Sequence, residues 1–209
     1  MSVINTLNHP LIDVKLTTLR DKDTPPAVFR RTLYELASLM SFEVFSHLRT
    51  ASHDIDTPLE AMTGAQLEDP APCLISILRA GNGLVDAFSA IIPEAPIGHL
   101  GMQRHPQTHQ PEAYYEKLPT NIDKRQIILV DPMLATGGSA IMAADQLKSH
   151  GATELVFVCL VAAPEGVEAL QTAHPDMPII TAALDRQLDE NCYILPGLGD
   201  AGDRIYNTV

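Results

Sequence analysis

The feature that most constrains the fold is a strand-like apolar run followed by an acid and a glycine-rich turn. Residues 127–130 read Ile-Ile-Leu-Val, and such a run is typical of a strand that is buried on both faces of a parallel sheet. Asp131 and Pro132 end the run, since proline cannot donate to the strand ladder. The small-residue turn 135–139 then leads into a helix predicted over 139–149. The sequence therefore predicts a strand, a turn and a helix in immediate succession.

This turn is a candidate phosphate site. The backbone N–H groups of Gly137, Gly138 and Ser139 can approach an anion because glycine permits the approach, and the helix dipole favours negative charge there. The P-loop motif does not match because no lysine follows the glycines, and the dinucleotide motif does not match because the glycines are adjacent. An acid ahead of the turn, Asp131, suits a ligand with hydroxyls on one side and a phosphate on the other, such as a ribose 5-phosphate. An ordinary turn whose glycines only permit close packing remains the alternative.

The stretch 131–138, Asp-Pro-Met-Leu-Ala-Thr-Gly-Gly, resembles the loop that binds 5-phosphoribosyl 1-diphosphate (PRPP) in type I phosphoribosyltransferases, in the form typical of the uracil branch of that family. Most members carry two adjacent acids where this chain has Asp131 and Pro132. The resemblance extends in order along nearly the whole chain, through the segments His9–Leu11, Ile77–Gly81, Gly101–Arg104, Val161–Gly166 and Tyr193–Asp203.

The resemblance implies a reaction and a set of site residues. The reaction is uracil plus PRPP giving UMP plus diphosphate, a step of pyrimidine salvage. The implied catalytic residues are Asp131, Arg104 and Asp200. The implied PRPP-binding residues are Arg79, Arg104, Asp131, Pro132, Met133, Leu134, Ala135, Thr136, Gly137, Gly138, Ser139 and Asp200. The implied uracil-binding residues are Ile194, Gly199, Asp200 and Ala201.

Within that set the resemblance assigns distinct roles. Residues 135–139 would bind the 5-phosphate, Asp131 the ribose hydroxyls, and Arg79 and Arg104 the pyrophosphate. Mg²⁺ is the implied cofactor, held mainly by PRPP, with Asp200 near it. A homo-oligomer and stimulation by GTP, making the protein an allosteric enzyme, are implied by the resemblance alone.

Composition limits the classes of partner. The formal net charge of the 209 residues is −12, which argues against a nucleic-acid partner and against an anionic membrane surface. A site for anionic PRPP must then be locally positive, and Arg79 and Arg104 are the candidates, although a solvated surface arginine is the usual alternative. The chain start lacks the basic and apolar regions of a secretion signal, and the three cysteines cannot all pair. We therefore expect one cytoplasmic domain spanning residues 1–209.

Strand-like and helical patterns alternate along most of the chain. Predicted strands lie at 73–78, from 97, at 127–130, 155–162 and 178–184, and predicted helices at 84–92, 139–149 and 166–173. This alternation predicts an α/β fold with a mainly parallel central sheet covered by helices on both faces. A long N-terminal helix is predicted over 24–49, and residues 52–69 are predicted to form a loop or a small β-arm.

Residues 101–118 are predicted to form a long irregular connection, which in a compact domain tends to be a functional flap. His105 and His109 have metal-like spacing, but no cysteine or carboxylate set completes a zinc site. The family pattern is broken here by Gln103, by His105 and Pro106, and by Ala113, whereas Arg104 is kept.

Three alternative functions stay open. The first is a phosphoribosyltransferase for another base, since the PRPP half would look the same. The second is an RNA-binding regulator of pyrimidine operons on the same fold, which would need a basic face. The third is a catalytically inactive scaffold, against which the intact Asp131, Arg79, Arg104 and Asp200 speak.

Overall fold

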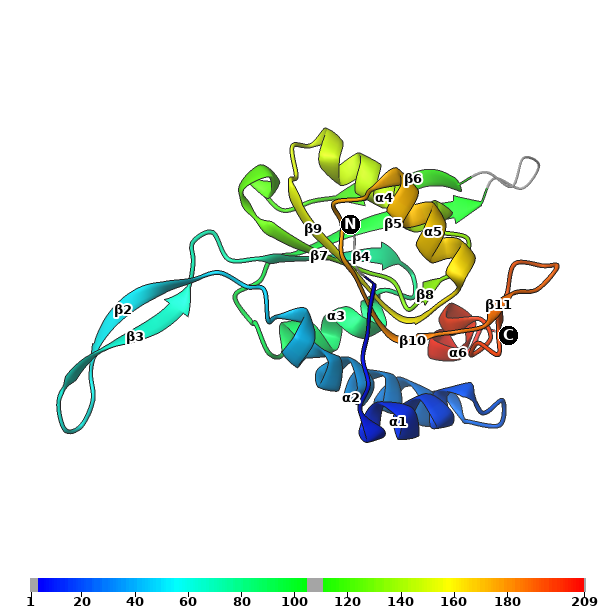
Figure 1. Ribbon diagram of the computed structural model, residues 1–209, viewed down its shortest axis with the longest axis horizontal. Helices are drawn as coiled ribbons and strands as arrows, with labels where there is room; N and C mark the ends of the chain where they lie inside the picture. The colour runs from blue at the N-terminus through cyan, green and yellow to red at the C-terminus, as the bar shows by residue number, and fades with distance from the viewer. Residues whose placement is uncertain (1–3, 105–110, 209) are drawn as a thin grey trace.

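The computed structural model describes residues 4–104 and 111–208, and only the backbone is described for residues 103, 104 and 111. Its centre is an eight-stranded sheet in the order β1-β10-β9-β7-β4-β5-β6, with β8 beside β9 (Figure 1). The strands are β1 Ile4–Thr6, β4 Cys73–Leu78, β5 Ile97–Arg104, β6 Pro111–Lys117, β7 Gln126–Val130, β8 Met133–Leu134, β9 Glu154–Ala162 and β10 Ile179–Leu184. Every pairing is parallel except that of β5 with β6. The predicted mainly parallel sheet is confirmed.

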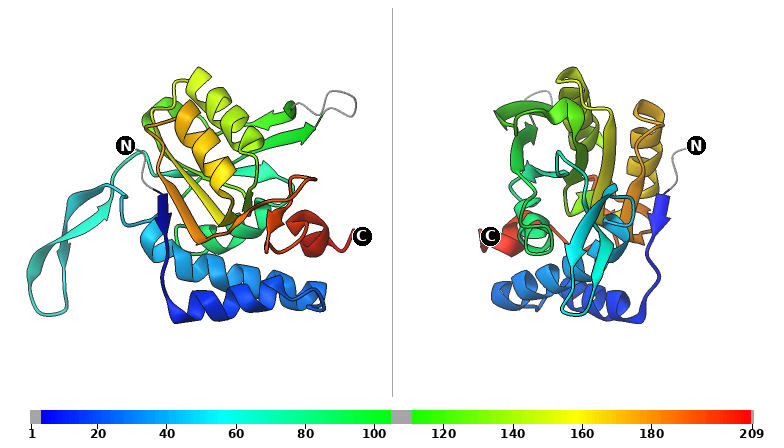
Figure 2. Two further views of the ribbon diagram at one scale, coloured as in Figure 1. Left: turned by 45° about the vertical axis from the view of Figure 1, so that its right-hand side comes forward. Right: turned by 90° about the vertical axis from the view of Figure 1, so that its left-hand side faces the viewer.

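Helices cover both faces of this sheet, as predicted (Figures 1 and 2). On one face lie α1 Pro10–Arg20, α2 Pro26–Val44 and α3 Asn82–Ser89, and on the other lie α4 Gly138–Ser149 and α5 Pro164–Ala173. The helix α6 Ala201–Tyr206 packs against α2, and the 3₁₀ turn η1 Ile122–Lys124 precedes β7. None of the described helices combines the length and apolar character that a membrane span requires.

The burial of β7 explains why its sequence is continuously apolar. Ile128 and Val130 join the core beneath α1, α2 and α3, whereas Ile127 and Leu129 join the core beneath α4 and α5. Successive side chains of a strand point to opposite faces, so both faces of β7 need apolar residues.

The N-terminal region differs from the prediction in two ways. The predicted helix over 24–49 is shorter, because α2 ends at Val44 and a turn follows it. A further helix, α1, precedes it, begun by Pro10 and capped by His9, whose Nδ1 accepts the Leu11 N–H at 3.1 Å. Its buried residues Ile12, Leu16 and Leu19 recur at helical spacing.

The small β-arm is confirmed. Strands β2 Thr50–Asp56 and β3 Ala61–Leu67 pair antiparallel and extend away from the body of the molecule (Figures 1 and 2). Every residue of β2 is exposed.

The prediction of an irregular connection over 101–118 is wrong for its described part. Strand β5 continues to Arg104 and pairs with β6, with an irregularity between Gly101 and Met102. Pro111 sits at the start of an edge strand, where a missing N–H donor is tolerated, so the prolines did not exclude a strand pair. His105, Pro106 and His109 lie outside the described residues.

Candidate active site

A cavity of ≈ 440 Å³ opens at the carboxyl end of β7 and joins two parts of the chain that are far apart in sequence. One side is formed by residues that follow β4 and β7, and the other by the segment between β11 Gln187–Leu188 and α6. Its lining residues are Ala80, Asp131, Met133, Ala135, Asn191, Cys192, Tyr193, Ile194, Gly199, Asp200, Ala201 and Gly202. In open α/β sheets, ligands bind outside the carboxyl ends of the strands, as this cavity would allow.

Asp131 is the lining carboxylate that its surroundings perturb most. Its N–H donates to the Val158 carbonyl at 3.2 Å, which holds the residue directly after β7 against β9, and its Oδ1 lies 3.4 Å from the Met133 nitrogen. Burial raises the pKa of Asp131 to about 7, the Met133 N–H opposes that rise, and the Asp200 carboxylate adds to it. A cation or a pair of hydroxyl donors brought to this carboxylate would favour its charged form.

The predicted phosphate turn forms the N-terminus of α4 beside this cavity. Gly137 precedes the helix with φ +83°, and among the described side chains none caps the first turn. Its orphan N–H groups therefore suit an anion. A β-carbon at Gly166 would lie 2.3 Å from the Ala135 carbonyl oxygen, so only glycine lets α5 pack this closely against the turn.

Two of the predicted PRPP-binding residues serve the turn through their backbones. The Pro132 carbonyl accepts N–H groups of Leu160 and Val161, and the Leu134 carbonyl accepts that of Ala163. The Leu134 side chain is buried in the core. These bonds tie the chain between Asp131 and the turn to β9, while Met133 and Ala135 line the cavity.

Arg79 directly precedes the cavity-lining residue Ala80 and follows β4 and a cis Leu78–Arg79 peptide bond. Its Nη2 is 3.3 Å from the Asp203 Oδ1, and its guanidinium lies 5.6 Å from the Tyr206 ring centre. The Tyr206 hydroxyl also donates to the Arg79 carbonyl at 2.9 Å. A β-carbon at Gly81 would lie 2.6 Å from the Val130 carbonyl oxygen. Glycine at this position thus brings the loop that carries Arg79 against the end of β7.

Arg104 is the last residue of β5, and its side chain lies outside the described part of the chain. Its predicted contact with pyrophosphate stays a prediction. Ala113, one of the departures from the family pattern, pairs with Met102 across the hairpin.

The four predicted uracil-binding residues are brought together with Asp131 in one cavity. Ile194 opens β12 Ile194–Leu195, Gly199 has φ +76°, and Ala201 begins α6. Asp200 caps α6, accepting the Asp203 N–H at 2.9 Å. The contacts of each residue with a ligand remain predictions.

The positions of Asn191 and Cys192 in the cavity wall were not predicted from the sequence. The Asp189 Oδ1 accepts the N–H groups of Asn191 at 2.9 Å and Tyr193 at 2.8 Å, and Cys192 has φ +66°. Aspartate commonly makes such turns with backbone groups two residues on, so Asp189 is the signal that would have predicted an ordered turn here.

Comparisons with known proteins agree with this geometry. A family model described as uracil phosphoribosyltransferase matches residues 6–208. A uracil phosphoribosyltransferase of Paracoccus denitrificans is 53% identical over 205 residues, which is 98% of this chain and 97% of the relative. The solved structure of the AQ2163 protein from Aquifex aeolicus is 32% identical, covers 98% of both chains and has a TM-score of 0.92. An adenine phosphoribosyltransferase of Trypanosoma brucei, solved with AMP, pyrophosphate and ribose-5-phosphate, shares the fold at 14% identity, with a TM-score of 0.56 over 90% of this chain and 86% of that one.

Proposed function

The chain belongs to the uracil phosphoribosyltransferase family, and we propose that its cavity transfers the phosphoribosyl group of PRPP to uracil, giving UMP and diphosphate for pyrimidine salvage. The observation that carries this proposal is that one cavity is lined both by Asp131 and Ala135, the first residue of the turn before α4, and by residues of the 194–201 segment. A ribose carrying a phosphate on one side and a base on the other needs such a two-sided site.

Catalysis of this reaction depends mainly on positioning the substrates and on stabilising the charges that develop. Breaking the bond between ribose C1 and the pyrophosphate oxygen builds positive charge on the ribose and negative charge on the leaving group, so oriented donors stabilise the transition state. In our proposal the N–H groups at the start of α4 hold the 5-phosphate and Asp131 accepts hydrogen bonds from the ribose hydroxyls. Arg79 and Arg104 offset the charge of the pyrophosphate.

Mg²⁺ is part of the proposal. Asp131 and Asp200 both line the cavity, and the charge of Asp200 contributes to the raised pKa of Asp131. Carboxylate oxygens are hard donors of the kind that Mg²⁺ takes, usually together with substrate phosphates. The described residues form no cluster of three or more metal-ligating side chains, so PRPP itself would supply most of the ligands. Asp200 would lie near the ion, and the ion would neutralise charge on the pyrophosphate.

The base is proposed to lie against the 194–201 segment. Uracil presents an N3–H donor between two carbonyl acceptors, and backbone groups of a loop can match that pattern. Ala201 is nearly fully buried at 3% exposure, and its small side chain lets the backbone approach a ring. Cytosine has an amino donor at C4 and an acceptor at N3, where uracil has a carbonyl acceptor and an N–H donor. Each hydrogen-bonding group left unpaired in such a pocket costs about 1–3 kcal/mol.

Three further properties are proposed from the family resemblance. The protein forms a homo-oligomer, for which the projecting β-arm with its exposed Leu59 offers a surface. It acts in the cytoplasm, in keeping with free cysteines at all three positions. GTP stimulates it, which is tested by adding GTP to the assay at limiting PRPP.

The decisive experiment incubates the protein with Mg²⁺, PRPP and labelled uracil and looks for labelled UMP. A panel of bases in the same assay distinguishes uracil from another preferred base. A salt-sensitive shift of pyrimidine-operon RNA, without UMP formation, would favour the regulatory alternative instead.

A further inference from the structure

We propose that Arg20 and Asp185 form a positioning pair that fixes the base-binding wall of the cavity, so that they set uracil affinity and base choice without contacting substrate. The inference rests on the proposed function, because it assumes that the 194–201 segment binds the base. Neither residue lines the cavity, and neither belongs to the PRPP-binding set.

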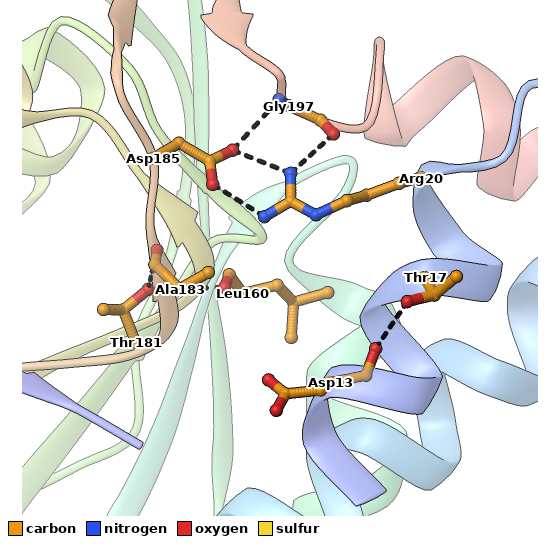
Figure 3. Close-up of polar contacts among 8 residues, drawn as sticks. All are labelled: Asp13, Thr17, Arg20, Leu160, Thr181, Ala183, Asp185 and Gly197. Carbon is orange, nitrogen blue, oxygen red and sulfur yellow. Dashed lines mark hydrogen bonds and ion pairs between the residues drawn. The ribbon is translucent and has the colours of Figure 1, made fainter. Parts of the chain in front are cut away.

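The pair and the backbone of Gly197 form a closed ring of hydrogen bonds (Figure 3). The Arg20 Nη2 lies 2.6 Å from the Asp185 Oδ1, and the Arg20 Nη1 lies 2.8 Å from the Asp185 Oδ2. The same Nη1 donates to the Gly197 carbonyl at 2.8 Å, and the Gly197 N–H donates to the Asp185 Oδ2 at 3.0 Å. Both backbone groups of Gly197 are therefore held by one ion pair.

The two ends of this ring are fixed to different parts of the fold. Arg20 is the last residue of α1. Asp185 follows β10, and its N–H donates to the Ala162 carbonyl at the end of β9 at 2.8 Å. The side chain of Asp185 is only 4% exposed and that of Arg20 is 24% exposed. A buried ion pair does not in general stabilise a fold more than apolar packing would. The planar guanidinium of Arg20, however, binds in a fixed geometry, so it holds Asp185 and Gly197 in one relative orientation.

The position of Gly197 determines where two cavity-lining residues lie. Gly197 has φ +61°, and a β-carbon there would lie 2.1 Å from the Ile194 carbonyl oxygen. The chain therefore folds back directly onto Ile194, which lines the cavity, and continues to Gly199, which lines it too. A shift of Gly197 would move both residues.

A second arginine holds the neighbouring residue. The Arg204 Nη1 donates to the Leu198 carbonyl at 2.8 Å, and its Nη2 donates to the carbonyl of Asp21 at 2.5 Å, just after α1. The carbonyls of Gly197 and Leu198 thus both accept hydrogen bonds from arginines, and these bonds tie this part of the segment to the end of α1.

Apart from Asp200, the PRPP half of the site is held by other contacts. Asp200 belongs to both halves, and it is held by α6, whose Asp203 N–H it accepts at 2.9 Å. Asp131 and the α4 turn are fixed by β9 and by Gly166 of α5, and none of the described hydrogen bonds of Arg20 or Asp185 reaches them. Loosening the pair should therefore affect the two substrates unequally.

The test uses Arg20→Lys and Asp185→Asn. Lysine keeps the charge but cannot bind both carboxylate oxygens and the Gly197 carbonyl in a fork, and asparagine keeps the shape but loses the charge. The matched control is Glu35→Gln, which removes the charge of Glu35. Glu35 lies on α2 and accepts a hydrogen bond from Lys15 of α1 at 2.5 Å, so the control weakens a different ion pair of α1. The readouts are KM for uracil, Kd for PRPP without uracil, the uracil-to-cytosine ratio of kcat/KM, and hydrogen exchange of the backbone amides of residues 194–200, Pro196 excepted, in ligand-free protein.

For both variants we expect the KM for uracil to rise about tenfold, since each loses at least one charge-assisted hydrogen bond. The Kd for PRPP should stay within about twofold, the preference for uracil over cytosine should fall, and amides 194–200 should exchange faster. Glu35→Gln should change none of these. Equal changes for uracil and PRPP, or unchanged exchange of the segment, would overturn the proposal. A wild type that makes no UMP would refute the proposed function, and hydrogen exchange would still decide whether the pair positions the segment.

Discussion

At the residue scale, Asp131 has both a structural and a chemical role, because it directly follows the buried strand β7 and lines the cavity. Its pKa of about 7, against an ordinary value of 3.8, means that the folded protein holds a proton that the unfolded chain has released between those pH values. Stability contributed by this residue is therefore complete below about pH 4 and is lost as pH rises through about 7. The surroundings of Asp131 disfavour its charged form in the ligand-free protein. This is expected at a site where a bound ligand provides hydrogen-bond donors or a cation for the carboxylate.

This gives a prediction for folding stability. Asp131→Asn should be more stable than the wild type at about pH 8, by about 1–3 kcal/mol, because asparagine has no charge to bury. The difference should shrink towards zero near pH 4. Urea unfolding of both proteins across this range measures it, and a difference independent of pH would show that burial does not suppress the charge of Asp131.

The same residue gives a prediction for binding. If the Asp131 carboxylate accepts hydrogen bonds from both ribose hydroxyls, each worth about 1.5–3 kcal/mol, then Asp131→Asn should lower kcat/KM for PRPP at least about tenfold. The affinity of the wild type for PRPP should rise as pH increases through about 7. The rise should exceed any change in Asp131→Asn, which is the control for titration of PRPP itself. Unchanged kinetics in a folded Asp131→Asn protein would contradict the assigned role.

At the scale of elements, the site depends on how closely α5 approaches the phosphate turn. Gly166→Ala places a β-carbon 2.3 Å from the Ala135 carbonyl oxygen, so the turn or the helix must move. We expect a loss of stability of about 1–3 kcal/mol and a PRPP affinity lowered at least about fivefold, because displaced N–H groups no longer meet the phosphate. The control is Gly64→Ala in the β-arm, whose nearest neighbour would lie at 3.5 Å. PRPP binding that is equal in the two variants would show that the turn tolerates the displacement.

At the scale of the whole molecule, some of the architecture and the site could be predicted from local patterns and some could not. The apolar run of β7 and the glycines after it have short-range causes, so the sheet, α4 and the position of Asp131 follow from the sequence. The β5–β6 hairpin was missed because prolines suggested an irregular chain, although an edge strand tolerates Pro111 at its start. The pairing of Arg20 with Asp185 joins residues far apart in the chain, and no local pattern signals it. Resemblance, rather than pattern, placed Ile194 and Ala201 with Asp131.

The β-arm gives a prediction about the oligomeric state of the protein. An isolated two-stranded hairpin is marginally stable in water, and this one is attached at its base, where Arg49 lies 3.0 Å from both Glu68 and Glu154.

Leu59 at the arm's tip is 95% exposed, and Ile55 and Met62 are 41% and 47% exposed, so the arm carries apolar area for which a second copy of the chain is the proposed partner. The wild type should then have a solution mass above its 22.7 kDa chain mass, and Leu59→Asp combined with Ile55→Glu should lower it towards that value. Light scattering after size-exclusion chromatography measures the mass, with Val14→Asp as the control, since Val14 is 58% exposed on α1. If the arm variant kept the wild-type mass, or if the wild type were a monomer, the arm would have no role in assembly. The arm extends away from the body of the molecule (Figure 1), and none of its residues lines the cavity. A dissociated variant that keeps its uracil and PRPP kinetics would therefore show that each copy carries a complete site.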